Sequence, residues 1–209
     1  MGVDIVTTTY RNVDKLKICL KSVVEKTKFV DYKWYIWAND PNDEMKSAIH
    51  EAVCVDEMVV DDRIVPIFND NNDGSFSSNN NEAAEEGSGE YILFLNDDIE
   101  PLNDTWLLNM KTILDTDPKV GVVGALLLYP DKKLVQHCGV MFDQRTNGLP
   151  YHIFYQKPLS QFMTTNRYYQ AVTGACMLVR RKDFEKLGGL DEGYRYGYED
   201  IALCLRLKH

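Results

Sequence analysis

The sequence lacks the short motifs that mark several large classes of protein. Its five cysteines include no C-x-x-C pair, and their odd number indicates reduced thiols in a cytosolic setting, not a disulfide framework or a zinc site. No G-x-G-x-x-G follows any apolar run, which argues against a Rossmann dehydrogenase. No apolar run approaches the roughly 18 residues that predict a transmembrane helix.

Positive charge is also scarce. The chain has 23 Lys and Arg against 32 Asp and Glu, a formal net charge of -9. A free-standing nucleic-acid binder is more often basic, so we expect no nucleic-acid partner. An anionic ligand would need local help from a metal ion or an arginine. We expect a cytoplasmic protein that reaches the inner face of the membrane only through missing regions or partners.

Strand and helix patterns alternate in the first half of the chain. Apolar residues make up 44% of the 209 residues, enough for the core of one domain. The alternation indicates βαβ units, and hence an α/β fold with a Rossmann-like, mostly parallel central sheet flanked by helices. The predicted strands are residues 3–9, 33–40, 63–69 and 90–98, and the predicted helices are 12–27, 43–53 and 75–89.

The second half is less regular. Helices are predicted at residues 104–117, 182–189 and 198–209, and strands at 120–129, 134–143 and 169–181. Residues 144–167 are aromatic, polar and irregular, as active-site loops often are. We predict a partly mobile acceptor-side loop there; the alternative is a packed subdomain that closes the sheet edge. We expect His137 and His152 to be surface or packing histidines.

Three predicted strands end in polar residues: Thr7–Thr9, Asn39–Asp40 and Asn96–Asp98. Ligands of open parallel sheets bind beyond the carboxyl ends of the strands, so these tips should share one edge. Adjacent carboxylates such as Asp97 and Asp98 repel each other unless a cation lies nearby. Their hard oxygen atoms suit Mg²⁺ or Mn²⁺ bound together with substrate phosphates.

Three stretches together resemble one family. "GEYILFLNDDIEP", "AVTGACMLVRRKDFEKLGGLDE" and "YEDIALCLRL" are similar, in this order, to the motifs of family 2 glycosyltransferases with the GT-A fold. The nearest group builds bacterial surface polysaccharide and includes rhamnosyltransferase-like members. The resemblance implies one catalytic domain over residues 1–209, with a nucleotide-binding half (1–98) and an acceptor-binding half (99–209). We also expect the chain to be cut from a longer protein.

The resemblance also implies roles for individual residues. Asp98 would bind the divalent cation, Mg²⁺ or Mn²⁺. Asp200 would be the general base, with Glu199 beside it as a second catalytic residue. The implied donor-binding residues are Thr9, Tyr10, Asn39, Asp40, Asn96, Asp97, Gly174 and Ala175, although Tyr10 could equally be a core aromatic.

The implied reaction is an inverting, metal-dependent transfer of a hexose or deoxyhexose. The donor would be a UDP- or dTDP-linked sugar and the acceptor a saccharide or a lipid-linked saccharide. Two departures from the family pattern stand out: Ala38 occupies a position where one alignment places a base-binding Asp, and His209 is not assigned as the metal-binding histidine that many relatives carry.

Three other classes remain open. A non-catalytic or incomplete GT-A module could bind nucleotide sugar within a larger protein. A retaining glycosyltransferase or a nucleotidyltransferase could share the fold. The stretch "TTTYRNVDKL" lacks the Gly- and Arg/Lys-rich loop that a nucleotidyltransferase usually has after its first strand.

Overall fold

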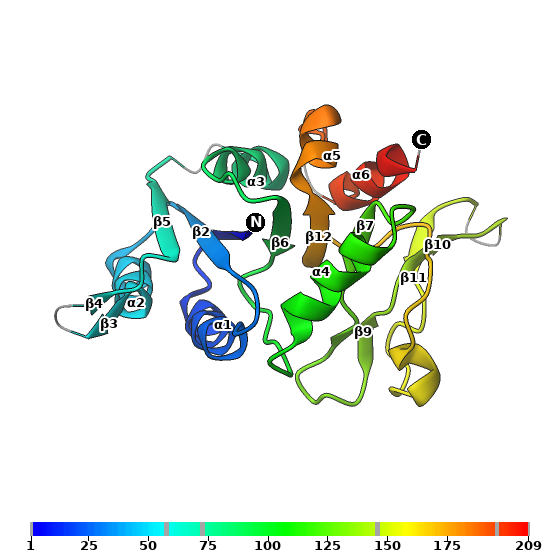
Figure 1. The fold of residues 1–209 in the computed structure, drawn as a ribbon, viewed down its shortest axis with the longest axis horizontal. Helices are drawn as coiled ribbons and strands as arrows, with labels where there is room; N and C mark the ends of the chain where they lie inside the picture. Colours follow the sequence, from blue (N-terminus) through cyan, green and yellow to red (C-terminus); the bar gives the residue numbers. More distant parts are fainter. Residues whose placement is uncertain (1, 57–58, 72–73, 145–146, 195–196, 209) are drawn as a thin grey trace.

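The computed structural model describes the chain except residues 1, 57–58, 72–73, 145–146, 195–196 and 209. Its centre is a six-stranded sheet in the order β5-β2-β1-β6-β12-β7 (Figure 1). Four neighbouring strands are parallel: β5 (Ile64–Asn69), β2 (Tyr32–Asn39), β1 (Val3–Thr9) and β6 (Tyr91–Leu95). β12 (Cys176–Arg180) runs antiparallel to both β6 and β7 (Val122–Gly124). The predicted mostly parallel α/β sheet is therefore confirmed.

Helices cover both faces of this sheet, because side chains alternate across each strand. One apolar cluster joins alternate strand residues such as Ile5 and Leu93 to α1 (Val13–Lys26), α2 (Asp43–Val53) and α4 (Trp106–Thr116). The opposite cluster joins Val6 and Phe94 to α3 (Phe76–Glu85), α5 (Arg181–Lys186) and α6 (Glu199–Leu207). Figure 1 shows these two groups of helices on either side of the strands.

Short strand pairs complete the chain. β8 (Leu127–Leu128) pairs with β9 (Val135–His137), and β10 (Val140–Phe142) pairs with β11 (Pro150–His152). The pair of β3 (Cys54–Asp56) and β4 (Val59–Val60) was not predicted.

Several predicted strands are shorter or divided in the structure. The strand predicted over residues 134–143 is broken at Gly139, whose φ is +116°. The strand predicted over 169–181 begins only at Cys176, because the amides of Thr173 and Gly174 bond to side chains and not to a neighbouring strand. The strand predicted over 90–98 ends at Leu95, so its polar tip lies beyond the sheet.

The described residues of the stretch 144–167 form a small lobe beside β9 and β10 (Figure 1). Residues 145 and 146 of this predicted loop lie outside the described part of the chain. The lobe contains β11 and a 3-10 turn at Gln161–Thr164, and it is bridged to the rest by Leu134 with Pro158. Phe154, Tyr155 and Phe162 are exposed in it. An acceptor-side role for the lobe stays a prediction.

Within the described residues, no helix has the length and apolar character needed to span a bilayer.

One buried ion pair links Asp4 of β1 to Arg181, the residue that follows β12. The Arg181 guanidinium contacts the Asp4 carboxylate through Nη2 at 2.7 Å, and it also donates to the carbonyl oxygens of Ala84 and Gly89. The Gly89 amide donates to the same Asp4 oxygen at 2.6 Å. Asp4 is only 4% exposed, so its charge depends on these partners.

Arg181→Met should therefore lower the free energy of unfolding by about 3–5 kcal/mol, because it leaves a buried carboxylate without its counter-ion. Urea unfolding followed by circular dichroism measures this change. Lys21→Met is the matched control, since Lys21 pairs with Glu25 on the exposed face of α1, and a change within about 0.5 kcal/mol is expected there. Equal stability of the two variants would show that Asp4 does not need Arg181.

Candidate functional site

The tips of β1 and β6 meet at the Asp97 carboxylate. The Thr9 hydroxyl donates to Asp97 Oδ2 at 2.6 Å, and the Asn12 amide donates to Oδ1 at 3.1 Å. Burial raises the pKa of Asp97, although both of these hydrogen bonds act to lower it. Because each oxygen already has a protein partner, Asp97 is a fixed support between two strand ends.

The sequence did not reveal the role of Asn12. Asn12 occupies the N-cap position of α1, but its side chain makes no capping hydrogen bond and donates to Asp97 instead. The signal that could have found it is its position: the polar stretch "TTTYRN" continues past the first strand to Asn12, in the turn that faces Asp97.

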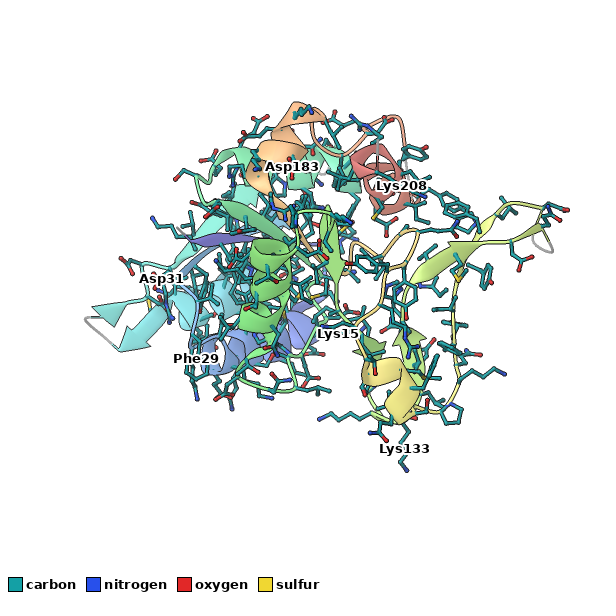
Figure 2. All side chains as sticks on the ribbon, turned by 45° about the vertical axis from the view of Figure 1, so that its right-hand side comes forward. Lys15, Phe29, Asp31, Lys133, Asp183 and Lys208 are labelled. Atoms are coloured by element: carbon teal, nitrogen blue, oxygen red, sulfur yellow. The ribbon has the colours of Figure 1, made fainter. Side chains whose placement is uncertain are left out.

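Asp98 is the more accessible carboxylate of the pair. Its side chain is 39% exposed, and Lys15 Nζ lies 3.5 Å from its Oδ2. Within the described part of the chain, no three His, Cys, Asp or Glu side chains are grouped to hold a metal ion. Asp98 is therefore an accessible carboxylate that a divalent cation could bind in place of Lys15, which is labelled in Figure 2. A single carboxylate fits Mg²⁺ or Mn²⁺ that takes its other ligands from phosphate and water.

The segment before β12 brings the predicted acidic pair to the same edge. The backbone amide of Asn96 donates to the backbone carbonyl oxygen of Ala175 at 2.9 Å. One residue earlier, the Gly174 amide donates to Asp200 Oδ2 at 2.7 Å. A Cβ added at Gly174 would lie 3.3 Å from the Cβ of Asp200, so the missing side chain allows the start of α6 to approach this segment closely.

The two adjacent acids of α6 have different surroundings. Asp200 accepts from Gly174 and, through Oδ1, from the Ile201 amide at 2.7 Å. Glu199 is buried, and its Oε2 has no hydrogen-bond partner among the described residues. Burial raises the pKa of Glu199, and the nearby charge of Asp200 adds to that rise. Asp200 is thus the oriented carboxylate, and Glu199 is turned into the protein.

At the tip of β2, the side-chain oxygen of Asn39 is bound within the protein. Asn39 is buried, and its Oδ1 accepts from Trp37 Nε1 at 3.0 Å and from Asn69 Nδ2 at 3.2 Å. The side-chain carbonyl oxygen of Asn39 therefore already accepts hydrogen bonds from within the protein. Ala38 is also fully buried, so neither residue offers a free acceptor to a base through its side chain.

Tyr10, Arg11 and Asp40 form the exposed corner beside β1 and β2. Tyr10 is 41% exposed, so the alternative of a core aromatic is wrong. The Arg11 guanidinium lies 4.7 Å from the Tyr10 ring centre and 3.1 Å from Asp40 Oδ2. The sequence did not single out Arg11, although it follows Tyr10 directly. Together these side chains offer an aromatic face and both signs of charge.

A cavity lies away from the predicted site residues. It has a volume of about 930 Å³ and is bounded by α4, β7, residues 163–172 and α6. Among the described residues that line it are Asp117, Tyr168 and Cys204, but none of the predicted site residues. The predicted residues thus gather at the sheet edge and not in this cavity. His209, which was left unassigned, lies outside the described residues.

Comparison with known proteins identifies relatives of the sequence. The model of the glycosyl transferase family 2 matches residues 4–188. The O-antigen biosynthesis protein RfbC of Myxococcus xanthus is 32% identical over 200 residues, which cover 93% of this chain and 15% of RfbC. The rhamnosyltransferase WbbL of Escherichia coli K12 is 32% identical over 130 residues, which cover 56% of this chain and 46% of WbbL. The chain thus spans less than half the length of either relative.

Solved structures share the fold at low sequence identity. The mannosyltransferase PcManGT from Pyrobaculum calidifontis, solved with GDP-Man and Mn²⁺, aligns over 96% of this chain and half of its own, with a TM-score of 0.66 and 15% identity. S. aureus TarS 1–349 aligns over the whole chain and 55% of its own, with a TM-score of 0.67 and 13% identity. From the match of its sequence over residues 4–188 and from its architecture, the chain belongs to glycosyltransferase family 2 and has the GT-A fold.

Proposed function

We propose that this chain is an inverting glycosyltransferase domain. It moves a hexosyl or deoxyhexosyl group from a UDP- or dTDP-linked sugar to a saccharide or lipid-linked acceptor of a bacterial surface polysaccharide. The names of RfbC and WbbL support this class of product. The observation that carries the proposal is the short backbone path from Asn96 to Ala175 and from Gly174 to Asp200, which brings the two acidic motifs to one edge.

The donor is held along the polar edge. Tyr10 and Asp40, at the corner beside β1 and β2, face the base, and the Thr9–Asp97 pair supports the ribose side. Asp98, whose side chain is 39% exposed, would lie beside the diphosphate and would hold Mg²⁺ or Mn²⁺ there. A bound divalent cation would neutralise charge on the departing diphosphate.

Asp200 acts as the general base. The acceptor hydroxyl oxygen attacks the anomeric carbon, the bond from that carbon to the diphosphate oxygen breaks, and the hydroxyl proton passes to Asp200. The nucleoside diphosphate leaves with the electron pair of the broken bond. Two backbone amides already fix the Asp200 carboxylate, and an ionised carboxylate retains further acceptor sites for the incoming proton. Such a base contributes about 10²–10⁴-fold to the rate.

Asp98→Asn should abolish Mn²⁺-dependent nucleotide binding and leave the fold intact, because it removes the accessible negative charge at the edge. Thermal shift and calorimetric titration with UDP and dTDP, each with Mn²⁺ or EDTA, measure the effect. Asp104→Asn is the matched control, since Asp104 is an exposed aspartate paired with a lysine away from the edge. Unchanged Mn²⁺-dependent affinity in Asp98→Asn would contradict the assignment.

Asp200→Asn should lower turnover by at least about 10²-fold at nearly constant donor affinity, since the base acts on the acceptor proton and not on the nucleotide. Release of nucleoside diphosphate, with KM for the donor, provides the measurement. Glu199→Gln changes the adjacent carboxyl and should have the smaller effect on turnover. The reverse order would assign the base to Glu199. A wild-type chain that binds the donor with Mn²⁺ but never turns over would favour the non-catalytic module.

A further inference from the structure

His137 lies directly behind the segment that contacts Asp200. It ends β9, is 2% exposed, and its Nε2 accepts a hydrogen bond from the Thr173 amide at 3.3 Å. The next amide in the chain, that of Gly174, donates to Asp200. Two side chains from distant parts of the sequence therefore hold consecutive amides of one irregular segment. The proposed sugar transfer gives His137 no part, although the residue is buried beside the segment that contacts Asp200.

His137 is joined in turn to the lobe of residues 144–167. Its Nδ1 lies 2.8 Å from Nδ1 of His152, which is at the exposed end of β11. Because Nε2 of His137 accepts from a backbone amide, its ring proton must be on Nδ1. That Nδ1–H then donates to Nδ1 of His152. The arrangement fits only when both rings are neutral.

We propose that His137 is a positioning residue: together with His152 it fixes the Thr173 amide so that the Gly174 amide meets Asp200, and it thereby links the lobe to the general base. The proposal rests on the role of Asp200 in the proposed function. Val140 supports the same link, since its amide donates to the carbonyl oxygen of Ala171 at 2.8 Å, just before Thr173. A shift of the lobe would thus be transmitted to the amide that orients the base.

Protonation would break this link. A proton on Nε2 of His137 would face the Thr173 N–H and would remove the acceptor of that hydrogen bond. Burial lowers the pKa of His137 to about 3, and the charge of His152 lowers it further. Tyr155 lies beside His152, with ring centres 6.5 Å apart. Cys138 and Tyr169 line the same cavity as His137. Burial raises the pKa of Tyr169 to about 12, so Tyr169 stays neutral.

The sign of the pH effect follows from that lowered pKa. A histidine with an ordinary pKa of about 6.5 takes up a proton on unfolding, whereas folded His137 does not. The stability contributed by neutral His137 is therefore complete above about pH 6.5 and is lost as the pH falls towards 3. The unfolding equilibrium constant should rise by up to about tenfold for each pH unit in that window.

Three variants test the proposal. His137→Leu leaves the Thr173 amide without an acceptor and should lower turnover at least about fivefold, with little change in the donor KM. His137→Gln can place Oε1 near the position of Nε2 without a titrating group, so it should restore turnover to within about threefold and remove the acid-side loss of stability described above. His50→Gln is the control, because His50 lies on α2 next to Cys54 and away from the edge.

Long-range ¹H–¹⁵N spectra of the histidine rings give a readout independent of activity. The proposal expects His137 of the wild-type chain to carry its proton on Nδ1 from pH 7 to pH 5. A proton on Nε2, or a Gln variant no better than the Leu variant, would overturn it. If the wild type turns over and His137→Leu does so equally well, only the positioning role fails. A wild type that never releases nucleoside diphosphate overturns both this role and the proposed function. Should His137→Leu not fold, the ring tautomer and the pH profiles of the wild type and His137→Gln decide.

Discussion

The partly buried carboxylate of Asp97 is the contact on which the polar edge depends. It is bound from β1 by the Thr9 hydroxyl and from the start of α1 by the Asn12 amide. Burial disfavours the charged form of a carboxylate, and hydrogen bonds to that form offset part of the cost. These bonds fix the turn after β6, so that the next residue, Asp98, lies at the surface. The contacts of Asp97 with Thr9 and Asn12 thus place the charge of Asp98 at the surface, and no separate loop is needed to hold it.

Four acidic residues at this edge have four different environments, and chemistry follows from the differences. Asp97 is saturated by side-chain donors, Asp98 is exposed near Lys15, Asp200 is oriented by backbone amides, and Glu199 is buried with an unpaired oxygen. The two proposed roles thus fall on different residues: Asp98 for the cation and Asp200 for the proton. The antiparallel pairing of β12 with β6 makes this possible, because β12 starts opposite the end of β6 and the preceding residues, Gly174 and Ala175, therefore lie at the tip of β6.

The periodicity of apolar residues predicted the strands and helices that pack one whole face against the core. It missed the places where hydrogen bonds between side chains and backbone amides determine the structure. The strands from Val3 and Tyr32 and the helix from Asp43 follow the apolar pattern closely. The start of β12 does not, since the preceding amides bond to His137 and Asp200, which lie far away in the sequence. The family resemblance located the edge, but the inward-facing carbonyl of Asn39 depends on Trp37 and Asn69 together and could not be read from "WAND" alone.

A crystal structure of the chain with Mn²⁺ and a nucleoside diphosphate, UDP or dTDP, tests the shared edge most directly. The diphosphate should lie beside Asp98 with the cation bound to that carboxylate, the base should contact Tyr10, and the Asp200 carboxylate should face the open side where a sugar would extend. Nucleotide bound in the 930 Å³ cavity beside α4 and α6, with Asp98 still paired to Lys15 and no cation at the edge, would contradict the assignment.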